Sequence, residues 1–310
     1  MHLTSGCYGK VPIHGDFIRH NVTGTEIDQI DQWLQAGILS SRQTMGSAWD
    51  ASFDASRPQR FLFRPSTGRM VAGVIAASKD KPGRRFPFLV FTPLDSKTPP
   101  GEATVLPAAL APFFDRAEEE ILHGWQGKDL KTYLARLDAL ALPGDLEEGK
   151  KNILNFVAGG TNQSLWAGLF GSSDDFRKYL LIHNLVETIR PGVVPKYALR
   201  IPRATRGPEV AFWLELCRKL SRREHLPTLA LWGPGRGDDP GGLTIVFDEL
   251  QSKYFLPLWW PERSNNLLFP LAEGSDQADA RVQQARTRYA TLLDDGALRL
   301  SSLMVRLTTS

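Results

Sequence analysis

The chain has 310 residues, 42% of them hydrophobic and 23% charged, which is typical of a globular protein with a sizeable buried core. Its 37 Lys and Arg residues against 34 Asp and Glu leave a formal net charge of only +3, and this argues against general nucleic-acid binding, which needs a concentrated basic face. The two cysteines are too few for a disulfide framework or a zinc cluster, no signal peptide is visible, and no apolar run is long enough to span a bilayer. We therefore expect a cytoplasmic protein without direct membrane insertion.

Patterns in the first half of the chain predict alternating strands and helices. Residues 8–17 should form a strand that runs into a loop, because prolines and glycines interrupt it. Residues 26–49 should form a helix, since apolar side chains recur there every three or four positions. The further predictions for this half are strands at 61–63, 70–77 and 87–92 and helices at 106–125 and 129–142.

A short polar segment separates the two halves and predicts a domain boundary. We expect one domain over 1–143 and a second over 151–310, with a turn between them. The elements predicted for the second half are strands at 164–167, 196–201, 228–232 and 243–247 and helices at 174–189, 208–220 and 276–293. This order favours an α/β protein, with an α/β/α sandwich as the N-terminal domain and a second, smaller α/β domain.

No residue pattern points to catalysis. The run Gly144 to Lys151 has the spacing of a phosphate loop, but Lys151 stands where a magnesium-binding hydroxyl is needed, and carboxylates would face the phosphates. Cys7, His14, Asp16 and His20 fit no established zinc spacing. We expect no catalytic residues, no cofactor and no metal.

Two short runs, residues 6–19 and 83–88, carry the most information. Gly9 and Gly15 permit backbone conformations closed to other residues, and Asp16 could hold a turn or pair with Arg84 or Arg85. The candidate residues of the two runs are Gly9, Lys10, Pro12, Gly15, Asp16, Phe17, Arg19, Gly83, Arg84, Arg85, Phe86 and Pro87. They form either a structural scaffold held by a buried ion pair or a polar surface patch that contacts another protein.

A second candidate for protein contact is the pair Trp259 and Trp260. If this edge is exposed, its aromatic area would suit an interaction hot spot. Core packing between the two domains is the alternative.

The two runs resemble the TagF (ImpM) family, which shows an aromatic-Gly-Lys-x-Pro-x-x-Gly-Asp-Phe start and a later Gly-Arg-Arg-Phe-Pro block. The resemblance is most specific from Gly6 to about Leu94, and the segment after Trp260 matches nothing in the family. It implies a non-enzymatic accessory protein of bacterial type VI secretion, acting as a post-translational repressor that binds and sequesters a forkhead-associated scaffold component. The alternatives are a structural subunit of the secretion apparatus and an enzyme whose site is not visible in the sequence.

Overall fold

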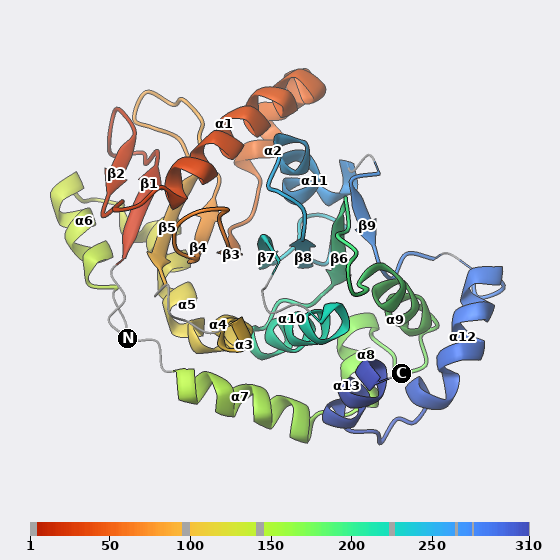
Figure 1. The fold of residues 1–310 in the computed structure, drawn as a ribbon. Coiled ribbons are helices and arrows are strands. Elements are labelled where there is room, and N and C mark those ends of the chain that lie inside the picture. The colour runs from red at the N-terminus through yellow and green to blue at the C-terminus, as the bar shows by residue number, and fades with distance from the viewer. Residues whose placement is uncertain are drawn as a thin grey trace.

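The computed structural model describes residues 5–94, 100–140, 146–222, 227–263, 266–274 and 276–309. Nine strands form one sheet in the order β2-β1-β5-β4-β3-β7-β8-β6-β9, which runs across the molecule in Figure 1. The strands are β1 (Gly6–Gly9), β2 (Ile18–His20), β3 (Gln59–Phe63), β4 (Val71–Ala76), β5 (Phe88–Pro93), β6 (Ala198–Pro202), β7 (Leu229–Gly233), β8 (Gly242–Val246) and β9 (Leu268–Pro270).

The two halves of the chain share this sheet. Strand β3 of the first half pairs antiparallel with β7 of the second, with Arg60 opposite Trp232. All neighbouring strands are antiparallel except β6 and β9, which run parallel. The division into domains at 1–143 and 151–310 stays a prediction. Residues 141–145, at the predicted boundary, lie outside the described residues, and so does the end of the helix predicted to reach Leu142.

Helices cover both faces of the sheet. Thirteen α-helical segments are described: α1 (Glu26–Met45), α2 (Trp49–Asp54), α3 (Pro100–Ala103), α4 (Leu106–Ala109), α5 (Ala111–Glu119), α6 (Leu130–Asp138), α7 (Leu146–Gly159), α8 (Asn162–Phe170), α9 (Arg177–Thr188), α10 (Gly207–Ser221), α11 (Phe255–Trp259), α12 (Ala280–Leu293) and α13 (Leu300–Thr309). Short 3-10 or π turns are η1 (Gly46–Ala48), η2 (Glu120–Gly124), η3 (Ser252–Tyr254) and η4 (Pro261–Arg263). None of the helices within the described ranges has the length and apolarity needed to cross a bilayer.

The sheet has a separate apolar core on each face. Along β3, Phe61 and Phe63 belong to an apolar cluster that includes side chains of α1, α2 and α11, whereas Leu62 between them belongs to the cluster on the opposite face, which includes side chains of α5, α9 and α10. This alternation follows from the two-residue period of a strand, and it places helices above and below the sheet in Figure 1. The predicted α/β class and α/β/α layering are confirmed.

Two long helices predicted for the first half are interrupted. The helix predicted over 26–49 ends at Met45, because Gly46 adopts φ 54° and the chain turns before α2 begins at Trp49. The helix predicted over 106–125 is divided into α4, α5 and η2, with prolines near the starts of α4 and α5.

Two predictions near the middle of the chain are wrong. The strand predicted at 164–167 is part of α8, whose start is capped by reciprocal hydrogen bonds between Thr161 and Ser164. A short apolar run does not distinguish a strand from a buried helix, and the cap decides here. The turn predicted around Gly149 is part of α7, where Gly149 packs against Ala109 of α4.

The segment after Trp260 completes the fold of the second half. Strand β9 extends the sheet beside β6, with Leu199 opposite Phe269. Helix α13 packs against α7 and α10 through buried Leu303 and Leu307. Neither element was expected from the sequence. Strand β9 has only three residues, too few for a periodic signal, whereas the apolar spacing of Leu300, Leu303 and Leu307 in α13 is a helical signal that was missed.

Candidate interaction site

The structure brings the two conspicuous sequence runs together. Strand β1 pairs with β5, so that Gly9 lies opposite Phe88. Beyond the strands, the Arg84 guanidinium donates to the carbonyl of Gly15 at 2.7 Å, and the rings of Phe17 and Phe86 meet edge to face at 4.8 Å between centroids. The two runs therefore form one structural unit, as expected if their strands were neighbours.

The ion pair predicted between Asp16 and the two arginines is wrong. Asp16 is exposed, accepts a hydrogen bond from the backbone N–H of Phe17 at 2.8 Å, and has no ion pair in the described part of the chain. Arg84 pairs with Asp80, and Arg85 pairs with Asp54 through two hydrogen bonds of 2.7 Å. Buried Asp80 therefore holds Arg84, and the exposed carboxylate of Asp54 holds Arg85.

Asp80 is the centre of the unit, although sequence reasoning missed it. Its side chain is buried, and its carboxylate lies 2.9 Å from Lys10 Nζ and 2.7 Å from Arg84 Nε. It also accepts the backbone N–H of Arg84 at 2.7 Å, while the Gly83 N–H closes a turn onto the Asp80 carbonyl. The signal that could have revealed it is the Asp-Lys-Pro-Gly stretch, which is typical of a turn whose aspartate bonds to nearby backbone amides.

Two opposing effects set the pKa of Asp80. Burial raises the pKa of the carboxyl, but hydrogen bonds from Lys10 and Arg84 and the charge of Lys10 outweigh it and lower the pKa to about 2. Because the folded-state pKa lies below that of an unfolded aspartate, near 3.9, ionised Asp80 stabilises the fold at neutral pH. That stabilisation is lost as the pH falls from about 4 toward 2.

Replacing Asp80 by asparagine tests this account. At pH 7 we expect Asp80→Asn to lower the melting temperature by about 5 °C, because Lys10 loses its buried counter-charge. The difference should shrink as the pH falls from 4 toward 2, where the parent protein loses the same interaction. Calorimetry across this pH range measures it. Asp28→Asn is the control, since the exposed pair of Asp28 with Arg19 contributes little. A difference that stays constant with pH would contradict the role of Asp80.

Several residues of the runs have purely local structural roles. Gly9 has φ 121°, and an added Cβ would lie 2.0 Å from the Pro87 carbonyl oxygen. Pro12 occupies the second position of a turn closed by the hydrogen bond from His14 N–H to the Val11 carbonyl. Phe86 and Pro87 are buried, and Arg19 pairs with Asp28 at 2.6 Å. These contacts hold the loop conformations.

The remaining residues form a surface that we call the motif face: Gly15, Asp16, Phe17, Gly83 and Arg84. All are exposed, and the Phe17 ring remains 40% accessible although it packs on Phe86. The Lys10 ammonium lies 4.9 Å from the Phe17 ring centroid. The face thus presents an aromatic ring beside the Arg84 guanidinium, with the buried Lys10 ammonium beneath the ring.

A depression of about 630 Å³ adjoins the motif face, and we call it the cationic hollow. Its walls come from the second run, from Lys10 and from the turn between α1 and α2. Its lining residues are Lys10, Arg42, Gly46, Ser47, Trp49, Asp50, Gly83, Arg84 and Arg85. Four of these carry a positive charge and one carries a negative charge. The hollow is therefore suited to an anionic group.

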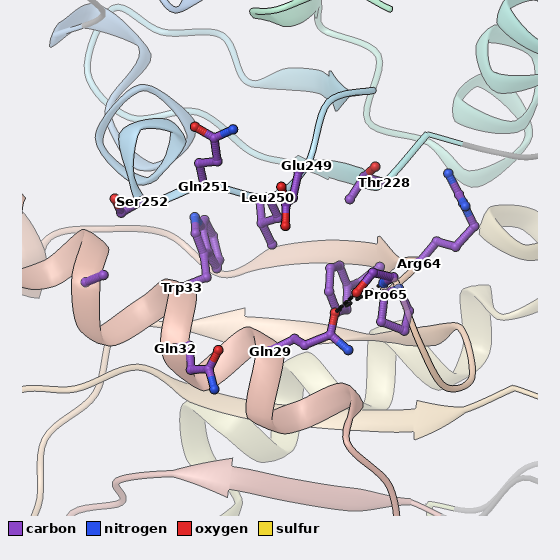
Figure 2. A pocket seen from close by; sticks show the side chains of 13 residues that line it. Gln29, Gln32, Trp33, Arg64, Pro65, Thr228, Glu249, Leu250, Gln251 and Ser252 are labelled. Atoms are coloured by element: carbon purple, nitrogen blue, oxygen red, sulfur yellow. Dashed lines mark hydrogen bonds between the residues drawn. The ribbon is translucent and has the colours of Figure 1, made fainter.

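A larger depression, of about 790 Å³, lies elsewhere between the two halves. Figure 2 shows Trp33 of α1 pointing toward Leu250 and Gln251, which follow β8, while Gln29 points toward the segment of Arg64 and Pro65. None of the residues singled out in the sequence lines it. Sequence reasoning missed this depression because its walls come from segments far apart in the chain.

The expectation of an exposed Trp259 and Trp260 edge is wrong for Trp260. Trp260 is only 1% exposed, and its ring meets that of Trp49 edge to face at 5.2 Å between centroids. Trp259 is half-buried and stacks on Phe53 and Phe255. Both rings lie between α11 and α2, so they pack the second half of the chain against the first.

Of the residues considered as metal ligands, Cys7 and His20 lie opposite each other on β1 and β2, whereas His14 and Asp16 lie in the loop between these strands. Cys7 is buried on β1, and His20 Nε2 lies 2.7 Å from Asp138 Oδ1 of α6. Over the ranges that the structure describes, no group of three or more His, Cys, Asp or Glu side chains is placed to hold a metal ion.

Comparisons with known proteins identify the part of the chain that carries the motif face. Residues 6–140 match the TagF N-terminal domain, described as type VI secretion system-associated. No curated protein matches the chain. Among solved structures, the chain is similar to the crystal structure of PA0076 from Pseudomonas aeruginosa PAO1, at 26% identity and a TM-score of 0.41, over 45% of this chain and 64% of that one. Residues 6–140 thus form a TagF N-terminal domain, a domain described as type VI secretion system-associated.

Proposed function

We propose that this chain is a post-translational repressor of type VI secretion that acts in the cytoplasm by binding, without catalysis. Its partner would be a forkhead-associated scaffold component, which it sequesters from assembly. The observation that carries the proposal is the TagF N-terminal domain match over the residues that build the motif face. Sequestration requires a complementary surface of about 800 Å² on each partner and no reacting group.

The motif face has the residue types of a contact centre. Phe17 is 40% exposed, and the Arg84 side chain is 60% exposed. Aromatic residues and arginine are enriched where proteins meet, because they combine large contact area with directional hydrogen bonds. Both side chains are also held in place, Phe17 by Phe86 and Arg84 by Asp80, which lowers the entropy lost on binding.

Burial divides the candidate residues between the two interpretations of the motif. The buried ones, Gly9, Lys10, Phe86 and Pro87, support the scaffold interpretation. The motif face itself supports the contact interpretation. We propose that the scaffold residues set the conformation of the loops and that the motif face binds the partner.

A secretion assay in the native bacterium tests the repressor function. Deletion of the gene should raise type VI secretion, because the partner is released, and expression of the parent protein should restore repression. Phe17→Ala should fold but fail to restore it, with partner affinity reduced about tenfold by the loss of an exposed aromatic ring at the centre of the contact. Leu122→Ala is the matched control, since Leu122 is also 40% exposed and lies outside the motif face.

The opposite results identify the alternatives. Reduced secretion after deletion, with stable co-purification of the chain with the assembled apparatus, would indicate a structural subunit. Unchanged secretion, with no secretion component captured on the protein from lysate, would contradict the proposal. Calorimetry with nucleotides and metal ions then becomes the test for an enzyme.

A further inference from the structure

The cations around the motif face are not all neutralised by the protein. Arg42 lines the cationic hollow, is exposed, and has no carboxylate partner among the described residues. Lys79 and Lys81, on the loop that carries Asp80, are also exposed and have no ion pair in the described ranges. The face therefore keeps positive charge that only solvent or a partner can balance.

The other cations of the hollow are already oriented. Arg85 is held from behind by Asp54 and by Asp50, and Arg84 is held by Asp80 and the Gly15 carbonyl. Arg42 lies with its guanidinium carbon 5.7 Å from the Trp49 ring centroid. Groups that are fixed before binding lose little conformational entropy when an anion arrives.

We propose that the cationic hollow and Phe17 together bind an acidic segment of a partner protein, with clustered Asp or Glu carboxylates beside an apolar or aromatic side chain. The carboxylates would lie against Arg42 and Arg84, and the apolar side chain would pack on the exposed edge of Phe17. Lys10 connects the two parts, since it lines the hollow and its ammonium lies 4.9 Å from the Phe17 ring centroid. The inference rests on the proposed function and defines the chemistry of the partner.

Charge and size favour a peptide over other polyanions. The hollow measures about 630 Å³, and Asp50 in its wall would repel a continuous run of phosphates. Nucleic acids and anionic membranes are bound by extended basic surfaces, whereas the formal net charge of this chain is only +3. An acidic peptide can place its carboxylates between the carboxylates of the protein.

Fluorescence anisotropy with labelled peptides tests the inference on the full chain. The probes are a dodecapeptide of Asp and Glu with one central Phe and a matched peptide of Asn and Gln with the same Phe. We expect the acidic peptide to bind at least tenfold more tightly and to weaken as the salt concentration rises. Arg42→Glu should weaken its binding about tenfold. Arg116→Glu, the same change at an exposed position of α5 on the opposite face of the sheet, should alter binding less than twofold.

Several results would overturn the inference. The first is that the acidic peptide does not bind up to millimolar concentration, or that both peptides bind equally well. The second is that Arg42→Glu and Arg116→Glu weaken binding equally. The third is that a single-stranded DNA dodecamer or phosphatidylserine vesicles bind more tightly than the acidic peptide. Capture from lysate separates this inference from the proposed function. If Arg42→Glu still captures the secretion component that the parent protein captures, the docking chemistry is wrong and the repressor function stands.

Discussion

Gly9→Ala should destabilise the protein by roughly 3 kcal/mol, one of the largest effects expected from a single methyl group in this chain. Gly9 has φ 121°, where a Cβ strains the backbone by about 1–3 kcal/mol. The new methyl would also lie 2.0 Å from the Pro87 carbonyl oxygen and 3.0 Å from Phe88 Cα, and backbone atoms cannot move aside without separating β1 from β5. Urea denaturation measures the change in the free energy of unfolding.

A second glycine of the same run supplies the control. Gly15 has no heavy atom within 4 Å of the site of an added Cβ and no positive φ. Gly15→Ala should therefore stay within about 1 kcal/mol of the parent protein. Equal destabilisation by both substitutions would contradict the close contact of Gly9 with Pro87, and a harmless Gly9→Ala would do the same.

Trp260→Ala should destabilise the protein by about 3–5 kcal/mol, the usual effect of removing a large buried aromatic side chain. Trp260 is 1% exposed, and its ring contacts those of Trp49 and Phe255 at 5.2 and 6.2 Å between centroids. Because Trp49 belongs to the first half of the chain, the cavity would loosen the contact between the two halves. Chemical denaturation followed by circular dichroism measures the effect.

An exposed apolar residue provides the comparison for Trp260. Leu154 on α7 is 64% exposed, so Leu154→Ala should change the free energy of unfolding by no more than about 0.5 kcal/mol. A small effect at Trp260 would contradict its burial between α11 and α2.

The parent protein should also unfold in one transition, since β3 and β7 join both halves in one sheet. Two separate calorimetric transitions would instead support the predicted domain boundary.

Local sequence patterns predicted the elements that have a strong periodic signal. The apolar repeat of α1, the apolar runs of β4 and β5, and the pair β7 and β8 all lie close to their predicted positions. Their apolar side chains are buried on the faces that the sequence pattern predicts, because the 3.6-residue period of a helix and the two-residue period of a strand each place apolar groups on a defined face. Elements whose pattern is short or ambiguous, such as α8 and β9, depend on caps and neighbours that lie outside their own residues.

The candidate site shows the same limit. Its two runs were recognised from their resemblance to the TagF motifs and from their glycines, prolines and paired arginines, which have restricted structural uses. The charged residues that surround these runs in the structure were not recognised. Asp80 and Arg42 are ordinary charged residues in the sequence, and they matter only because one is buried beside Lys10 and the other lines the cationic hollow.

The sequence by itself determined the α/β class, the TagF N-terminal domain over residues 6–140 and the two runs that meet at β1 and β5, because these depend on local composition, period and motif. The tertiary structure alone decided which charges pair, that Trp260 lies in the core and that both halves share one sheet. Ion pairing and burial depend on distances between residues far apart in the chain, and several carboxylates compete for each arginine. Only the folded chain determines which carboxylate lies within reach of each guanidinium group.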